Sequence, residues 1–332
     1  MSAAEAVNPD HILKDLAELW TSMGQPHSDQ PEAPEAQQGS GVLRACAMTL
    51  IVFVDEEDDP QDIGQTLAEL MRTHPSRALV VRVGQTDGDL QSRVFAQCWK
   101  PHGQALQICC EQVELSVSLN RLNDAASILA PVTAPDLPRV VWFRSSRLAA
   151  AADLSHLVAL GDKIIVDSTR PGAPAFADLR TLMMAGCLVG DLAWTRITRL
   201  RELLAQLIGR RAPETLTRIE LTHGGSAPGA SAKYLQAWLR RAFPQAAVDF
   251  RSGAGPAEEL SAIDVAPDLK IQIDHGCAKY EIGTRAQYAK ISPGPEPRLL
   301  AEELNIIEHD RIFESTLERM TPWSPPFRIP AK

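Results

Sequence analysis

Two apolar runs separated by a helix-length segment constrain this chain more than any other feature. Residues 47–54 form a continuous apolar run rich in β-branched side chains, and residues 78–83 form a second one. Between them, Asp59 and Pro60 can start a helix that reaches about His74. A strand, a helix and a strand of these lengths predict a parallel βαβ unit with a right-handed crossover. The chain is therefore predicted to be an α/β protein built on buried parallel strands.

The same alternation continues along the chain and divides into two patterns near residues 209–213. The first pattern includes strands around a turn at residues 100–103. Further strands are expected at 139–143, 163–167, 216–223, 248–251, 269–274 and 279–282, and helices at 119–130, 176–188, 197–208, 231–243 and 298–320. We expect two sheet-based lobes in series, an N-terminal domain at 42–210 with mostly parallel βαβ units and a C-terminal α/β domain at 211–332.

An amphipathic helix and a polar tether are expected before the first lobe. Residues 1–23 include a candidate cap at Asn8, a proline at the first helical position and apolar side chains at three- and four-residue steps. Residues 24–41 are rich in Pro, Gln, Ser and Gly without apolar periodicity, which predicts a flexible linker. The helix must bury its apolar stripe, and docking on its own core is favoured over docking on a partner.

Charge and composition exclude several classes of partner. The formal net charge is −9, so the chain offers no basic surface to nucleic acid or to anionic membranes. No apolar run approaches the roughly 18 residues of a membrane-spanning helix, and the N-terminus lacks the cationic and apolar regions of a secretory signal. The six cysteines lack framework spacing and are expected to be reduced core residues. These features predict a soluble cytoplasmic protein.

The sequence contains no motif of a known catalytic centre. There is no P-loop, no Gly-x-Ser-x-Gly elbow, no His-Glu-x-x-His and no Cys-x-x-Cys. Asp274, His275 and Cys277 favour a satisfied turn over a metal site. Cys109 and Cys110 favour two buried thiols on opposite faces of a strand over a redox pair. Without a matched nucleophile and base, or a metal shell, we expect no catalytic residue, no metal and no cofactor.

Two polar loops at predicted strand ends are the candidate binding elements. Residues 167–170 (Asp-Ser-Thr-Arg) follow one strand, where α/β sheets place ligand-contacting loops, although Asp167 could equally cap a turn. His223, Gly224 and Gly225 follow another strand and precede a helix, so they could present backbone N–H groups to an anion or form a plain glycine turn. Nearby arginines suit carboxylate or phosphate binding, although solvated ion pairs are the simpler interpretation for any single one.

Several segments resemble hallmark segments of the OpcA family and occur in the same order. The strongest is 190–196 (Gly-Asp-Leu-Ala-Trp-Thr-Arg), followed by 201–207 (Arg-Glu-Leu-Leu-Ala-Gln-Leu). The others are 44–50, 74–77, 107–111, 135–144, 163–168, 176–180 and 223–225. The resemblance covers residues 42–285, with a departure at 142–145, where Trp-Phe-Arg-Ser replaces the two tryptophans and glycine that relatives often carry.

This resemblance implies a function exerted through a partner. The family is known as the glucose-6-phosphate dehydrogenase assembly proteins, whose members are not enzymes but bind, help to assemble and activate that dehydrogenase. It therefore implies a non-catalytic allosteric activator in the oxidative pentose phosphate pathway. By residue type and motif membership, the partner-binding residues would be Trp142, Arg144, Asp167, Ser168, Arg170, Asp191, Trp194, Arg196 and Arg201.

Alternatives to this interpretation stay open at the level of sequence. Trp142 and Trp194 could be core residues, in which case the interface would lie elsewhere. The chain could instead be a sugar-phosphate-binding enzyme or sensor that uses residues 167–170 and 223–225, which would bind its ligand without any partner protein. It could also be a scaffold that binds the dehydrogenase without altering its kinetics.

Overall fold

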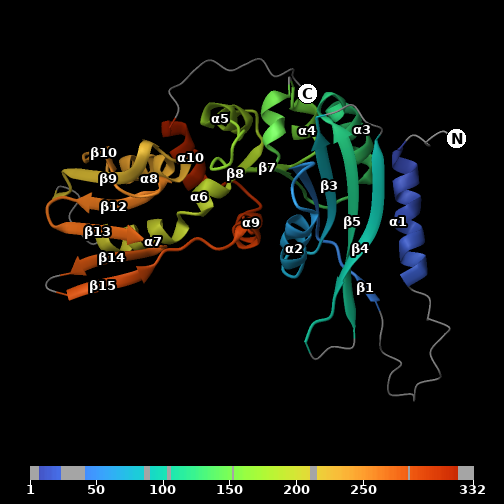
Figure 1. The fold of residues 1–332 in the computed structure, drawn as a ribbon, viewed down its shortest axis with the longest axis horizontal. Helices are drawn as coiled ribbons and strands as arrows, with labels where there is room; N and C mark the ends of the chain where they lie inside the picture. The colour runs from blue at the N-terminus through green and yellow to red at the C-terminus, as the bar shows by residue number, and fades with distance from the viewer. Residues whose placement is uncertain are drawn as a thin grey trace. The chain divides into compact units, whose positions relative to one another are not determined.

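The structure, a computed structural model, describes residues 7–23, 42–85, 90–102, 106–151, 153–209, 215–282 and 285–320. The predicted linker at 24–41 lies outside the described residues. The chain forms two compact units, Met1–Ile165 and Val166–Lys332, each of which is described here by itself (Figure 1).

The first unit is built on a mostly parallel sheet. Its strands are β1 (Val42–Arg44), β2 (Met48–Asp55), β3 (Ser76–Gly84), β4 (Gln91–Trp99), β5 (Gln107–Ser118), β6 (Arg139–Phe143) and β7 (Lys163–Val166). They lie in the order β1-β5-β3-β2-β6-β7, and β4 adds to β5. Every pairing among them is parallel except the one between β4 and β5. The predicted α/β class and the parallel βαβ units are confirmed.

Local sequence explains how this sheet is covered. Helix α2 (Pro60–Met71) begins where Asp59 accepts a hydrogen bond from the backbone N–H of Gln61 and where proline takes the first position. Figure 1 shows α2 on one side of the sheet and the helices α1 (Pro9–Met23) and α3 (Leu122–Val132) on the other. The short helix α4 (Ser155–Val158) contacts α3. Because both faces are covered, the central strands β2 and β3 are buried almost throughout.

The N-terminal helix α1 docks on its own unit, as the apolar stripe predicts. Ile12 and Leu16 are buried. Trp20 Nε1 donates to Glu111 Oε1 at 2.5 Å, and the guanidinium of Arg44 lies 5.3 Å from the Trp20 ring centroid. Glu111 is itself buried and also accepts from Arg77 Nε at 2.5 Å. The helix is therefore held by an apolar stripe and by one hydrogen bond to a buried carboxylate.

The prediction that all six cysteines are reduced is wrong. Cys98 on β4 and Cys109 on β5 form a disulfide. They are direct cross-strand partners, with Cα atoms 4.1 Å apart. The six cysteines lack framework spacing, and this pair arises instead from the register of the β4–β5 hairpin, which composition does not show. Cys110, the next residue, is a buried free thiol whose pKa is raised to about 11 by burial.

The second unit carries a mixed sheet and most of the polar residues singled out above. The strands of this unit are β8 (Leu188–Asp191), β9 (Arg218–Pro228), β10 (Ala247–Gly253), β11 (Ala257–Glu258), β12 (Leu260–Val265), β13 (Leu269–Asp274), β14 (Cys277–Ile282) and β15 (Arg285–Lys290). All of them except β8 belong to the mixed sheet. The mixed sheet has the order β10-β9-β12-β13-β14-β15, with β11 on β9. The helices are α5 (Phe176–Met184), α6 (Leu192–Thr195), α7 (Thr198–Ile208), α8 (Ala230–Ala242), α9 (Glu296–Leu304) and α10 (Arg311–Met320). The single helix predicted at 298–320 is two helices.

An aromatic core explains why the second unit begins well before its mixed sheet. The Tyr234 ring on α8 lies 5.9 Å from that of Trp194 on α6 and 5.8 Å from that of Phe313 on α10. These contacts join Trp194 of α6 to a residue of α8 that lies 40 positions later in the sequence, and through it to α10. The domain boundary predicted between residues 210 and 211 lies outside the described residues and stays a prediction; the compact units divide earlier, within β7.

Candidate functional site

A buried carboxylate organises the strand-end residues of the second unit. Asp191, at the end of β8, is fully buried. It accepts hydrogen bonds from the Ser168 backbone N–H at 3.0 Å and from the Ser168 hydroxyl, from Ala193 N–H at 2.9 Å and from the Tyr234 hydroxyl at 2.8 Å. Burial raises the pKa of Asp191 to about 6, although these hydrogen bonds oppose the rise. Asp191 therefore ties the loop after β7 to α6 and α8.

A second carboxylate in the same loop is paired with an arginine. Asp167, 1 % exposed, receives Arg196 Nη1 on Oδ1 at 2.6 Å and Nη2 on Oδ2 at 2.7 Å. Burial would raise the pKa of Asp167, but the bidentate pair with Arg196 and hydrogen bonds from Thr169 lower it overall. Arg170 lies 3.6 Å from Glu296 on α9. Asp167 and Arg170, at the two ends of this loop, are thus both ion-paired within the unit.

Trp194 is a core residue, stacked under an arginine. It is 3 % exposed, and the Arg201 guanidinium carbon lies 3.4 Å from its ring centroid. Burial lowers the pKa of Arg201 to about 10, which the neighbouring Asp310 partly opposes. The indole N–H of Trp194 points to Asp310 Oδ2 at 3.4 Å. Arg201 and Trp194 were both predicted to bind a partner, but only the arginine retains partial exposure.

A further buried acid explains the glycine of the strongest motif. Glu303 on α9 is 4 % exposed and accepts from the Thr195 hydroxyl at 2.9 Å. A Cβ at Gly190 would lie 2.2 Å from Glu303 Oε1, so this position needs glycine for close approach. Sequence reasoning did not single out Glu303, Tyr234 or Asp310. The usable signal for Tyr234 and Glu303 was a polar group set among the apolar positions of an amphipathic helix.

The structure places the predicted site residues in different environments. Asp167, Ser168, Asp191, Trp194 and Arg196 come together in the second unit. Trp142 and Arg144 belong to the first unit. Asp167, Asp191, Trp142, Trp194 and Arg144 are all buried, so little of their surface is accessible, and their assignment to a partner surface stays a prediction. The partly accessible residues of the predicted set are Ser168, Arg170, Arg196 and Arg201.

The first unit has its own strand-end polar network. Asp55, at the end of β2, accepts hydrogen bonds from the hydroxyls of Ser145 and Ser146 and from the backbone N–H groups of Ser146 and Arg147. Partial burial would raise the pKa of Asp55, but these hydrogen bonds together lower it. Arg144 bridges Asp58 at 2.8 Å and Asp62 at 3.0 Å.

The turn from β2 to α2 opposes phosphate binding. Residues 55–59 are Asp-Glu-Glu-Asp-Asp, five consecutive acids without a glycine. Nucleotide-binding α/β folds use a glycine-rich turn at such a place, where backbone N–H groups meet phosphate. An acidic turn at this place repels a phosphate group.

The loop predicted at His223, Gly224 and Gly225 is a strand. All three residues lie within β9, and Gly224 pairs with Gly253 on β10. His223 is buried, with its ring 5.7 Å from that of Phe250. A Cβ at Gly224 would lie 2.0 Å from the Pro256 carbonyl oxygen, so glycine here permits close strand packing. That these residues bind an anion stays an untested prediction, now without the expected loop.

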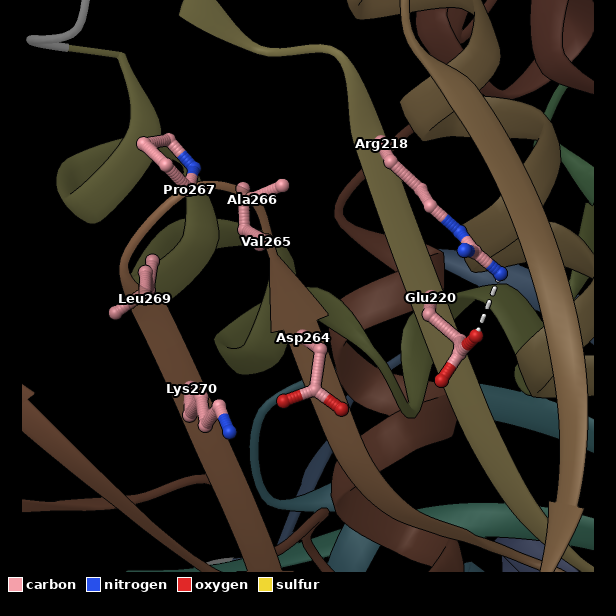
Figure 2. A pocket seen from close by; sticks show the side chains of 8 residues that line it. All are labelled: Arg218, Glu220, Asp264, Val265, Ala266, Pro267, Leu269 and Lys270. Atoms are coloured by element: carbon pink, nitrogen blue, oxygen red, sulfur yellow. Dashed lines mark hydrogen bonds and ion pairs between the residues drawn. The ribbon is translucent and has the colours of Figure 1, made fainter.

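The remaining polar features offer little to a small ligand. Asp274 and Cys277 pair across a tight hairpin turn that His275 and Gly276 complete, as predicted. In the described part of the chain, no group of three or more His, Cys, Asp or Glu side chains could hold a metal. No helix among the described residues is long and apolar enough to cross a membrane. A shallow pocket of about 220 Å³ lies at the β12–β13 turn, where Figure 2 shows Arg218 donating to Glu220 beside Asp264 and Lys270.

Fold and site together define a two-unit α/β protein. The acidic side chains at its strand ends are hydrogen-bonded or ion-paired to groups of the same unit. Residues 67–182 match the family domain described as the glucose-6-phosphate dehydrogenase subunit N-terminal domain. Residues 187–317 match the corresponding C-terminal domain. The chain belongs to the OpcA family, as the sequence motifs predict.

Relatives and solved structures add context. The chain is 28 % identical over 200 residues to a putative OxPP cycle protein OpcA of Synechocystis, which covers 58 % of this chain and 41 % of the relative. It is 24 % identical over 196 residues to the Nostoc punctiforme protein of the same description, covering 56 % and 42 %. The chain thus spans less than half the length of these curated relatives.

Solved structures resemble the chain only in broad outline. Biliverdin reductase from Synechocystis superimposes with a TM-score of 0.46 at 9 % identity, covering 82 % of this chain and 96 % of the reductase. A Gfo/Idh/MocA family oxidoreductase from Vibrio cholerae gives 0.43 at 10 % identity, covering 82 % and 94 %. Both likenesses are below the level that supports a conclusion about activity.

Proposed function

We propose that this chain is a non-catalytic protein that binds glucose-6-phosphate dehydrogenase and activates it, supporting the oxidative pentose phosphate pathway. The match of both halves of the chain to the two domains of the OpcA family carries the proposal. The relatives are described as OxPP cycle proteins, which supports the same pathway. A cytoplasmic location fits this partner.

The internal pairing of the strand-end groups supports a role without catalysis. Asp167 is occupied by Arg196, and Arg170 lies beside Glu296. The alternative of a sugar-phosphate-binding enzyme or sensor has no specific observation in its favour. The acidic turn at residues 55–59 likewise opposes a phosphate-bearing cofactor in the first unit.

The accessible part of the strand-end loop is the surface we assign to the dehydrogenase. Ser168, Thr169, Arg170 and Arg196 are exposed or half-buried, and the buried Asp167 and Asp191 hold them in place. Arg170 on this loop and Arg196 at the end of α6 stay partly accessible beside their internal acids, and such arginines suit carboxylates of a partner protein. Activation is then a population shift, limited by the difference in affinity between the two states of the dehydrogenase.

A kinetic titration tests this proposal. Glucose-6-phosphate dehydrogenase from the same organism is assayed across substrate concentrations with increasing amounts of this chain. We expect a saturable fall in the KM of the dehydrogenase or a rise in its kcat. Arg170→Glu should weaken the apparent affinity of this chain for the dehydrogenase at least about tenfold. Arg319→Glu, an exposed change on α10, is the matched control and should behave as the wild type.

Each other outcome of the titration has a distinct meaning. Unchanged kinetics without co-elution of the two proteins would refute the proposed partner. Co-elution without a kinetic change would leave a scaffold. Activation unaffected by Arg170→Glu would keep the function but reject the loop as its surface.

A further inference from the structure

The mixed sheet of the second unit has one covered face and one open face. Ile219, Leu221, Val248, Ile263 and Ile271 are buried on the side of α8. The residues that alternate with them point the other way and are mostly exposed. Figure 2 shows four of these, Arg218, Glu220, Asp264 and Lys270, on neighbouring strands.

The open face carries two rows of side chains that run across the strands. The first row is Asp249, Glu220, Asp264 and Lys270, continued by Glu281 and Ala286. The second row is Arg251, Thr222, Ala262, Gln272, Lys279 and Tyr288, which are successive register partners from β10 to β15. Each residue of the first row lies two positions from a residue of the second row on the same strand.

The two rows are complementary to each other. At the β10 end Asp249 neighbours Arg251, and on β14 Glu281 neighbours Lys279. On β15 the small Ala286 neighbours Tyr288, which is 67 % exposed. Consider a second copy related by a two-fold axis that lies in the plane of the interface, midway between the rows and parallel to them. This axis would place the first row of each copy over the second row of the other copy. Acid would then meet base on β10 and β14, and Tyr288 would pack over Ala286.

We infer that this open face binds a second copy of the chain, which therefore forms a symmetric dimer through its mixed sheet. Such an isologous contact needs a self-complementary surface, which the two rows provide. Face-to-face sheets pack with their strands within about 30° of each other. Six strands at about 4.8 Å and about six residues at about 3.4 Å give roughly 600 Å² per copy, or roughly 1,200 Å² in all. That is the area at which specific interfaces begin.

The test measures the mass of the full chain and of charge-reversed variants by analytical ultracentrifugation. The wild type is expected to pass from monomer to dimer between about 1 µM and about 100 µM, the range for an interface of this size. Lys279→Glu should raise the dimer dissociation constant at least about tenfold, because Glu would face Glu281 of the second copy twice in each dimer. Arg319→Glu, the same charge change on α10, should leave it unchanged.

A mixing experiment separates this interface from any other. Lys279→Glu and Glu281→Lys should each dissociate alone, yet associate when mixed, because residues 279 and 281 of the two copies then again pair acid with base. Circular dichroism checks that each variant is folded. A wild type that stays monomeric throughout overturns the inference. So does a dimer that is insensitive to Lys279→Glu, or variants that fail to associate when mixed.

Discussion

Two aspartates, each at the end of a β-strand, show how differently the two units hold a carboxylate. Asp55 in the first unit and Asp191 in the second each accept several hydrogen bonds, including one from a serine hydroxyl. Asp55 is half-buried, and its pKa falls below the usual value. Asp191 is fully buried without an arginine among its hydrogen-bond donors, and its pKa rises to about 6. Desolvation therefore decides whether the pKa of the carboxyl group rises or falls when the hydrogen bonding is similar.

The two units also differ in their overall charge. Residues 1–165 contain 22 acidic and 12 basic residues, whereas residues 166–332 contain 20 and 21. The net negative charge of the chain therefore comes from the first unit, since the second unit is nearly neutral. The acidic turn of the first unit remains in contact with water, whereas the second unit buries Asp167, Asp191 and Glu303 inside hydrogen-bonded networks. We expect the second unit to be the more sensitive to loss of a single polar group.

The largest expected effect comes from removing the buried carboxylate. Asp191→Ala would leave Ser168, Ala193 and Tyr234 donors without their acceptor, at a cost of about 3–5 kcal/mol in the free energy of unfolding. Asp55→Ala should cost only about 1 kcal/mol, because water can replace the lost acceptor. Urea unfolding of both variants measures the difference. Equal losses would show that burial does not separate the two sites.

The pH dependence of stability should separate the same two groups. Asp191 has a folded pKa above its unfolded value, so the stability it contributes is present below about pH 4 and is lost as the pH rises through about 6. The loss is about 3 kcal/mol for a shift of this size in a fully buried group. Asp55 has a lowered pKa, so its contribution disappears only as the pH falls below about 4.

The control for this pH effect is the uncharged isostere. Asp191→Asn should flatten the dependence of the unfolding free energy between pH 4 and pH 6, as measured by urea unfolding at each pH. Asp55→Asn should leave that window unchanged. A wild-type stability that is constant across the window would contradict the buried, raised pKa of Asp191.

A smaller contrast is expected between two glycines. Gly190→Ala in the second unit would push the new Cβ against the buried Glu303, and we expect a loss of about 2 kcal/mol. Gly64 lies inside α2, where a Cβ would meet nothing within 4 Å, so Gly64→Ala should stabilise by about 0.5–1 kcal/mol. Thermal unfolding followed by circular dichroism reports both changes. A destabilising Gly64→Ala would mean that α2 tolerates no added side chain.

Local patterns predicted the first unit well. The apolar runs of β2 and β3, the cap at Asp59 and the stripe of α1 are properties of neighbouring residues, and the structure confirms the elements that they indicate. The predicted order of segments and the OpcA motifs likewise needed no tertiary information. The linker at 24–41 and the boundary at 210–211 stay predictions.

What only the tertiary structure decided involves residues far apart in the chain. The sequence by itself determined the α/β class, the docked N-terminal helix and the family, because hydrophobic periodicity and motifs are local. The Cys98–Cys109 pair, the close packing of Gly224 and the contacts of Asp191 with Ser168 and Tyr234 depend on strand register and helix packing. Burial then turned several expected interface residues, Trp142 and Trp194 among them, into core residues. The exposure of a polar or aromatic side chain depends on every element packed around it, and no local pattern contains that information.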